Sequence, residues 1–106
     1  MNRAGPPQTS SAPRDIIVTN ERGQPSAPIA IGSLVTVGRA ESCEIRINDS
    51  FSSQMHARVF DYEGVTYLED LNSTNGTFLN DTKVSGTAPL HVGDLIQIGN
   101  TTLELQ

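Results

Sequence analysis

The sequence predicts an all-β fold, an antiparallel β-sandwich or barrel, and three observations support this prediction. Apolar residues alternate with other residues in many short runs, such as Val35/Val37 and Leu103/Leu105, and a period of two is typical of half-buried strands. Gly, Asn, Asp or Pro bounds these runs, and such residues favour turns. No window has the i, i+3, i+4, i+7 apolar spacing of an amphipathic helix. Many short strands with closely spaced turns therefore indicate a sandwich or a barrel.

The chain begins with a segment that does not share this pattern. Residues 1–14 are rich in Pro, Ser and Gln and have no periodic apolar spacing. We expect this segment to be a disordered tail or linker, because it has too little apolar surface to pack. The folded domain is then expected to cover residues 15–106.

About ten strands are predicted within the domain. The clearest alternating pairs, in chain order, are Ile16/Val18, Val35/Val37, Ile45/Ile47, Ala57/Val59, Ile96/Ile98 and Leu103/Leu105. They place strands near 15–19, 34–37, 44–47, 56–61, 95–98 and 100–105. The remaining predicted strands occupy other short runs between turn residues, at 28–31, 65–70, 77–80 and 82–84. Loops of such a fold gather at the ends of the sheets, where a rigid scaffold can position them.

The charge of the chain limits what it can bind. The net charge is −5, Lys83 is the only lysine, and no run of basic residues exists. Broad nucleic-acid binding needs clustered Lys and Arg that displace counterions, so we expect no nucleic-acid partner. Any bound anion must be held locally, by a few charges and many hydrogen-bond donors.

The cysteine content and the hydropathy of the chain indicate where in the cell the protein is located. The single cysteine, Cys43, excludes an intrachain disulfide and fits a reducing environment. The first residues, MNRAGPPQTSSAP, lack the apolar centre of a signal peptide. No apolar run approaches the roughly 20 residues of a membrane span. We therefore expect a cytoplasmic protein without membrane insertion by this segment.

The stretch DLNSTNGTFLN, residues 70–80, has three interpretations. Asn75-Gly76 between apolar residues is typical of a tight hairpin turn. Residues 72–74 and 75–77 both fit the N-glycosylation pattern, but three other sites match it too, so it reflects a composition rich in Asn, Ser and Thr. The third interpretation is a polar ligand-binding loop. The polar residues before Asn75 make the connection longer than a two-residue turn, and an Asn amide could pair with the N–H and C=O of an extended peptide.

Two other segments carry candidate site residues. Arg39 follows Gly38 at the end of a predicted strand. It could be a solvated surface charge, or its guanidinium could bind phosphate or carboxylate through a fork of donors. Ser53 and His56 lie three residues apart where a polar loop enters a strand, and could be a nucleophile and its base.

A hydrolase would need more than Ser53 and His56. It would also need an orienting acid, for which Asp49 or Asp70 could serve, and an oxyanion hole. The G-x-S-x-G nucleophile elbow is missing from the sequence. In the alternative interpretation, the histidine ring nitrogens brace the loop backbone and leave the serine hydroxyl free to donate. His91 is the only other histidine, so we expect no metal site.

Taken together, the ordered motifs resemble those of the forkhead-associated (FHA) domain family. They are Gly38-Arg39, then Ser53-Gln54-Met55-His56, then Asn75-Gly76-Thr77, supported by EDLNSTNGTFLN and by VGDLIQIG before the last strand. Each motif alone is weak, whereas the ordered set is specific, and it covers residues 15–106. The resemblance implies a sandwich of about eleven strands that binds phosphothreonine peptides through loops at one end. It also implies a non-catalytic module without a cofactor, whose partner is a Ser/Thr kinase or a kinase substrate.

The resemblance also implies residue roles. Arg39 and Ser53 would contact the phosphate, Asn75 would bind the peptide backbone, and Thr74 would line the pocket. Phosphothreonine carries about −1.5 to −2 charges and three strong acceptors, so a few donors suffice at roughly 1.5–3 kcal/mol per charge-assisted bond. Three further positions would support the site structurally: Gly38, His56 and Gly76.

One position departs from the family pattern, and another is a candidate for specificity. Many family members have a basic residue after the motif serine, where this chain has Gln54; its amide can donate a hydrogen bond but adds no charge. The family often selects the peptide residue three positions after the phosphothreonine through the loop before the motif serine. Phe51 lies in that loop and could favour an apolar residue there, or could instead pack against its own loop.

Two further alternatives concern how the domain is used. Thr9 lies in the expected tail and could, once phosphorylated, bind to the domain of its own chain, although an inert linker is the simpler expectation. The domain could also be degenerate and make phosphate-independent protein contacts. Retention of Arg39, Ser53, His56 and Asn75 together argues against degeneracy.

Overall fold

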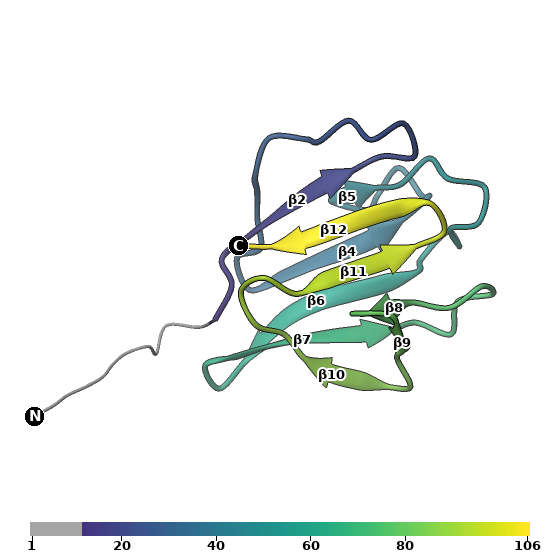
Figure 1. Ribbon diagram of the computed structural model, residues 1–106. Helices are drawn as coiled ribbons and strands as arrows, with labels where there is room; N and C mark the ends of the chain where they lie inside the picture. The colour runs from purple at the N-terminus through teal and green to yellow at the C-terminus, as the bar shows by residue number, and fades with distance from the viewer. Residues whose placement is uncertain (1–11) are drawn as a thin grey trace, which may run out of the picture.

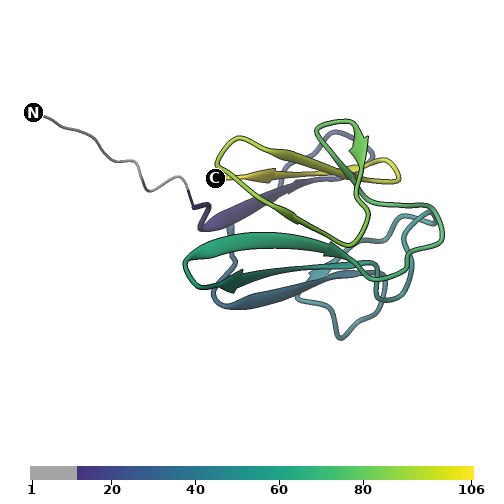
Figure 2. The same cartoon turned by 90° about the horizontal axis from the view of Figure 1, so that it is seen from below.

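The computed structural model describes residues 12–106, and these form two β-sheets packed face to face, with no helix among them (Figures 1 and 2). The sandwich predicted from the alternation of apolar residues is thereby confirmed. The strands of this part of the chain are β2 (Asp15–Thr19), β3 (Ile29–Ala30), β4 (Leu34–Gly38), β5 (Ile45–Arg46), β6 (Ala57–Tyr62), β7 (Val65–Asp70), β8 (Phe78–Leu79), β9 (Thr82–Lys83), β10 (Thr87–Pro89), β11 (Leu95–Ile98) and β12 (Thr101–Leu105).

The two sheets have different strand orders. One has five strands in the order β10-β7-β6-β4-β5, and the other has six in the order β3-β2-β12-β11-β8-β9. Most neighbouring strands are antiparallel, as expected, but β4 and β5 pair in parallel with Val37 opposite Ile45. A period of two is the same in both kinds of pair, so the alternation pattern could not distinguish them.

One strand was not predicted. β10 contains only three residues, one of them Pro89, and pairs with β7 at the edge of the five-stranded sheet. Proline cannot donate a ladder hydrogen bond, and it occurs in sheets mainly on edge strands. The ten predicted strands all exist, and each of their ends lies within one residue of the prediction.

The apolar core lies between the sheets and contains the predicted alternating residues. Along β6, Ala57 and Val59 are fully buried, whereas Arg58 and Phe60 point to the outer face and are partly exposed. Other strands repeat this alternation, which places one face of each sheet in the core. The largest fully buried apolar side chains are Ile16, Ile45, Leu68, Leu90, Ile96, Ile98, Leu103 and Leu105.

Two hairpins turn through residues with positive φ. Glu63-Gly64 connects β6 to β7, and Asn80-Asp81 connects β8 to β9, with φ values of 48° and 71° at the latter two residues. Two consecutive positive φ values are the signature of a type I′ turn, whose twist matches that of the flanking strands.

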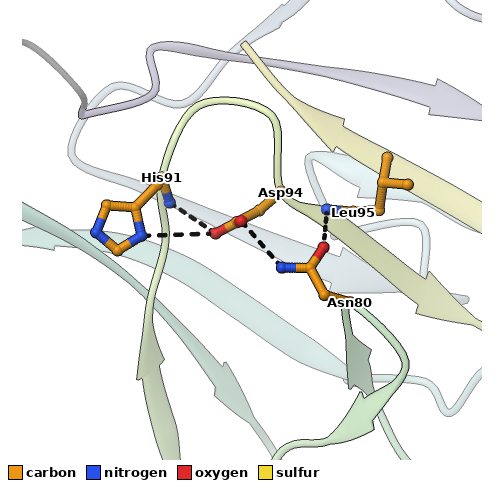
Figure 3. A network of polar contacts seen from close by, with 4 residues as sticks. All are labelled: Asn80, His91, Asp94 and Leu95. Carbon is orange, nitrogen blue, oxygen red and sulfur yellow. Dashed lines mark hydrogen bonds and ion pairs between the residues drawn. The ribbon is translucent and has the colours of Figure 1, made fainter.

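Asn80 also ties the β8–β9 turn to the start of β11 (Figure 3). Its side-chain amide donates to Asp94 at 3.0 Å, and its side-chain carbonyl accepts from the backbone N–H of Leu95 at 3.0 Å. The other carboxylate oxygen of Asp94 accepts from the backbone N–H of His91 at 2.8 Å. This network holds the β8–β9 turn against the turn between β10 and β11.

The two ends of the described chain meet at one end of the sandwich. The backbone N–H groups of Arg14 and Asp15 donate to the carbonyl of Gln106 at 2.8 and 3.1 Å, and Gln106 returns a bond to the carbonyl of Asp15. Pro13 is buried as well. The opposite end carries the connections β4–β5, β5–β6 and β7–β8 (Figure 1). Thr9 lies outside the described residues.

Neither a membrane helix nor a metal cluster occurs in residues 12–106. No helix there is long and apolar enough to cross a bilayer. No group of three or more His, Cys, Asp or Glu side chains in the same range is arranged to hold a metal ion.

Candidate functional site

Three loops that are distant in the sequence are hydrogen bonded to one another at the end of the sandwich opposite the chain ends. They are residues 39–44 between β4 and β5, residues 47–56 between β5 and β6, and residues 71–77 between β7 and β8. All the candidate residues from the sequence lie in these loops or directly beside them. The structure therefore brings the three predicted motifs together.

Gly38 allows the first two loops to approach closely. A Cβ atom at this position would lie 2.2 Å from the carbonyl oxygen of Gln54, so only glycine fits. Beyond Gly38, the N–H groups of Arg39 and Ala40 donate to the carbonyls of Ser53 and Gln54 at 3.0 and 3.1 Å. The Arg39 side chain is partly exposed, and its guanidinium has no hydrogen bond or ion pair within residues 12–106.

Ser53 connects the second loop to the third. Its Oγ accepts a hydrogen bond from the backbone N–H of Thr74 at 3.1 Å. The hydroxyl proton stays available for another acceptor, because the hydroxyl group can donate and accept at once. Ser53 is partly exposed, and Gln54 next to it is exposed.

His56 braces both loops from inside the protein. The ring is fully buried. Its Nδ1 accepts from the backbone N–H of Ser53 at 3.0 Å, and its Nε2 lies 2.9 Å from the carbonyl oxygen of Gly76. A backbone N–H can only donate and a carbonyl can only accept, so the proton is on Nε2 and the ring is neutral. The prediction that the ring nitrogens brace the loop backbone is confirmed.

Asp70 forms its hydrogen bonds with residues of the third loop and none with His56. Its Oδ1 accepts from the hydroxyls of Ser73 and Thr77 at 2.5 and 2.7 Å, and Oδ2 accepts from the Ser73 N–H at 3.2 Å. The Ser73 hydroxyl in turn accepts from the Gly76 N–H at 3.0 Å. Partial burial raises the pKa of Asp70, but hydrogen bonds from Ser73 and Thr77 lower it by more, so the net pKa lies below the ordinary value.

Asp49 fixes the second loop in a similar way. Its carboxylate accepts from the backbone N–H of Phe51 at 2.8 Å and of Asn100 at 2.7 Å. Both ring nitrogens of His56 are already bonded to backbone groups, so neither Asp49 nor Asp70 orients that histidine as a base. The Ser–His–acid arrangement considered from the sequence is thus not assembled.

Within the stretch 70–80, residues 71–77 form a loop and not a tight hairpin at Asn75-Gly76. β8 begins only at Phe78, and the two-residue turn is Asn80-Asp81. Asn75 is exposed, and its Nδ2 donates to the carbonyl of Phe51 at 2.9 Å, which joins the second and third loops. Gly76 has φ of 91°, a left-handed conformation that favours glycine.

A hollow of about 400 Å³ lies beside these loops. Phe51, half exposed at 50%, and Asn75 form one side of it. The remaining lining residues are Phe78 of β8, Asp81 of the β8–β9 turn, Gln97 of β11, and Gly99 and Asn100 of the turn after β11. The exposure of Phe51 leaves its ring available to a ligand. The remaining part of the lining was not predicted from the sequence, because Phe78 and Gln97 lie in the supporting motifs without an assigned role, and Asp81 and Asn100 lie just outside them.

Comparison with known proteins identifies the family of the chain. Residues 35–99, more than half of the chain, match the family model for the FHA domain. FhaB of Mycolicibacterium smegmatis, an FHA domain-containing protein, is 35% identical over 94 residues, which are 88% of this chain and 60% of that protein. The chain thus spans about three fifths of the length of this curated relative.

Solved structures agree with the sequence relatives. One FHA domain, from a study of phosphothreonine-dependent FHA domain interactions, has a TM-score of 0.73 and 26% identity over 87% of this chain and 95% of its own. The FHA domain of FhaA, solved in complex with the intracellular domain of Rv3910, has the same TM-score and identity over 87% of this chain and 98% of its own. The resemblance identified from the motifs is confirmed, and the chain belongs to the FHA domain family.

Proposed function

We propose that this domain binds phosphothreonine-containing segments of partner proteins and performs no catalysis. The observation that carries the proposal is the joint arrangement at Ser53. Its carbonyl holds the Arg39 backbone, and its Oγ holds the Thr74 backbone. These backbone bonds hold together a unit whose side chains offer the uncommitted guanidinium of Arg39, the hydroxyl of Ser53 and, next to Thr74, the exposed amide of Asn75.

The chemistry of this unit matches a phosphorylated, extended peptide. The phosphate would accept from the Arg39 guanidinium and from the hydroxyl of Ser53, with Thr74 lining the pocket and the exposed amide of Gln54 at its edge. Asn75 would bind the peptide backbone, because its Oδ1 can accept while Nδ2 keeps its bond to the carbonyl of Phe51. Charge-assisted bonds of roughly 1.5–3 kcal/mol each would provide most of the affinity.

The proposal of a non-catalytic module is supported by His56. Its two nitrogens serve Ser53 N–H and Gly76 C=O, so taking a proton from the serine hydroxyl would require breaking one of these bonds. Gly38, His56 and Gly76 then act as supports of the loops, as their positions in the motifs imply.

We further propose the setting in which the domain works. Of the solved FHA domains with a similar structure, one comes from a study of phosphothreonine-dependent interactions and another was solved in complex with an intracellular domain. These relatives support a cytoplasmic role downstream of a Ser/Thr kinase, with the kinase or its substrate as the partner. The binding domain would extend from about residue 15 to residue 106, with the preceding residues as tail or linker.

Phe51 is the proposed specificity residue for the peptide segment that follows the phosphothreonine. The hollow beside Asn75 has Phe51 and Phe78 as its aromatic walls. An apolar peptide side chain three positions after the phosphothreonine would fill it. A peptide array indifferent to that position would contradict this role, and Phe51→Ala should remove the preference without abolishing phosphate dependence.

The proposed function is tested by calorimetric titration with a degenerate phosphothreonine peptide library. The same library in phosphoserine and unphosphorylated form serves as ligand control. We expect binding only to the phosphothreonine form, and a loss of at least tenfold in Arg39→Ala, since a charge-assisted bond exceeds the roughly 1.4 kcal/mol of one decade.

Arg14→Ala is the matched protein control, because this exposed arginine lies at the opposite end of the sandwich. It should bind like the wild type. Binding that ignores phosphate, or that survives Arg39→Ala, would instead indicate a phosphate-independent interaction domain.

A further inference from the structure

Arg46 lies beside Arg39, although it belongs to none of the recognised motifs. It is the exposed second residue of β5, opposite Gly38 in the parallel β4–β5 pair. Its Nε donates to the backbone carbonyl of Arg39 at 3.0 Å. The backbone of Arg39 is therefore held on one side by the carbonyl of Ser53 and on the other by the Arg46 guanidinium.

No carboxylate among residues 12–106 neutralises the charge of Arg46. The ion pairs within residues 12–106 are Arg58 with Glu69 and, when the histidine is protonated, His91 with Asp94. Arg46 contacts no carboxylate in that range, although the chain has twelve acidic side chains against seven lysines and arginines.

The acid closest to Arg46 on its own segment is committed elsewhere. Glu44 accepts from both the N–H and the hydroxyl of Thr36 at 2.7 Å, and these bonds lower the pKa of Glu44. Glu41, in the β4–β5 loop, is exposed and forms no ion pair within the described residues. Arg39 and Arg46 are thus hydrogen bonded to each other without an acid partner in the described part of the chain, and their two positive charges favour an anion as ligand.

Arg46 has enough free donors to bind that anion. A guanidinium carries five N–H donors in a rigid fork, and only Nε is used here, so the four N–H groups of both Nη atoms remain. The bond to the carbonyl of Arg39 fixes the guanidinium beside the residue that leads the proposed phosphate site. The Arg46 side chain is therefore partly ordered before the ligand binds, and binding loses less side-chain entropy.

We infer that Arg46 supplies the second cation for the phosphothreonine phosphate, in place of the basic residue that position 54 lacks. The inference rests on the proposed function and deepens it. Gln54 can donate a hydrogen bond but adds no charge, so Arg39 would otherwise meet a nearly dianionic phosphate alone. Arg46 comes from β5, on the other side of Arg39, and restores a pair of cations.

The test compares Arg46→Gln, Arg46→Lys and the charge-matched control Arg14→Gln in titrations with one phosphothreonine peptide that the wild type binds. We expect Arg46→Gln to weaken binding five- to twentyfold and to give a shallower dependence of affinity on salt. Arg14→Gln should stay within twofold of the wild type. Arg46→Lys should recover part of the affinity, because it returns the charge but not the fork.

Phosphorus NMR of the bound peptide separates a phosphate contact from a purely structural role. A nearby cation favours the dianion, so loss of Arg46 should raise the second pKa of the bound phosphate. Adding Gln54→Arg to Arg46→Gln should restore affinity. An Arg46→Gln variant within twofold of the wild type, or one with weaker binding but an unchanged phosphate pKa, would overturn the inference. A wild type that binds no phosphothreonine peptide would instead refute the proposed function itself.

Discussion

Replacing His56 with leucine tests whether this buried ring couples the two loops of the site. Leucine is apolar and of similar size, so it fills the space but bonds to neither neighbour. The Ser53 N–H and the buried Gly76 carbonyl would lose their partners at 3.0 and 2.9 Å. An unpaired buried polar group costs about 1–3 kcal/mol. Ser53 is partly exposed and can recruit water, which sets the expected total at about 2–4 kcal/mol.

The expected loss leaves a folded protein, because domains of this size are stable by about 5–15 kcal/mol. Urea unfolding followed by circular dichroism measures the loss, with an unchanged slope against urea concentration as a check for two-state behaviour. Peptide binding should fall by at least tenfold under conditions where the variant is folded, since Ser53 and the loop containing Gly76 would no longer be held together.

Thr66→Val is the matched control for His56→Leu. Thr66 is buried, donates to Asp61 at 2.8 Å, and lies by the β6–β7 hairpin, at the other end of the sandwich from the site. The Thr66→Val variant should lose about 1 kcal/mol of stability and bind the peptide with wild-type affinity. A stability loss below 1 kcal/mol in His56→Leu, or a destabilised His56→Leu variant that binds peptide as tightly as the wild type, would contradict the coupling of the two loops through this ring.

Three further predictions concern other parts of the site. Gly38→Ala should lose more than 2 kcal/mol in urea unfolding, because its Cβ would lie 2.2 Å from the Gln54 carbonyl oxygen; Gly86→Ala, with φ of 77° and open space around it, should lose only about 1 kcal/mol, and equal losses would contradict the steric argument. The pKa of Asp70 is lowered from 3.8 in the folded state, so its stabilisation is present above about pH 4 and is lost as the pH falls through the folded value. Asp70→Asn should therefore flatten the fall of unfolding free energy below pH 4, and a wild-type slope in the variant would count against this role. Gln54→Arg should raise the affinity for a phosphothreonine peptide three- to tenfold, with a steeper salt dependence in calorimetry; unchanged affinity would mean that position 54 does not face the phosphate.

The strands were largely predictable because one face of each sheet is buried. Residues such as Val35 and Val37 point into the core, whereas Thr36 between them does not. Apolar residues therefore recur at every second position of the sequence. β10 was not predicted, because Pro89 is one of its three residues and proline in a short run argues against a strand. Alternation of apolar residues also does not indicate which strands are neighbours, so the parallel pairing of β5 was not predicted.

The motif residues of the site were predictable, including the expected supports Gly38, His56 and Gly76, but the long-range supports outside the motifs were not. Asn75 and Ser53 are recognisable because their residue types and order repeat a known pattern. Asp49, by contrast, holds its loop through Asn100, 51 residues away in sequence, and no local pattern indicates such a bond. The contact of Arg46 with the Arg39 carbonyl likewise depends on the parallel register of β4 and β5. Long-range backbone partners of this kind become visible only in the structure.

The meeting of Asp15 and Gln106 at one end of the sandwich affects how the domain can be tethered. A segment fused before Asp15 or after Gln106 would start at the end of the sandwich opposite the three loops (Figure 1). Such a segment does not have to pass across the binding surface. Linker length would then set the effective concentration of the loops around a second bound partner, while leaving the intrinsic affinity unchanged. In this geometry, the avidity of a longer protein can be adjusted without altering a residue of the site.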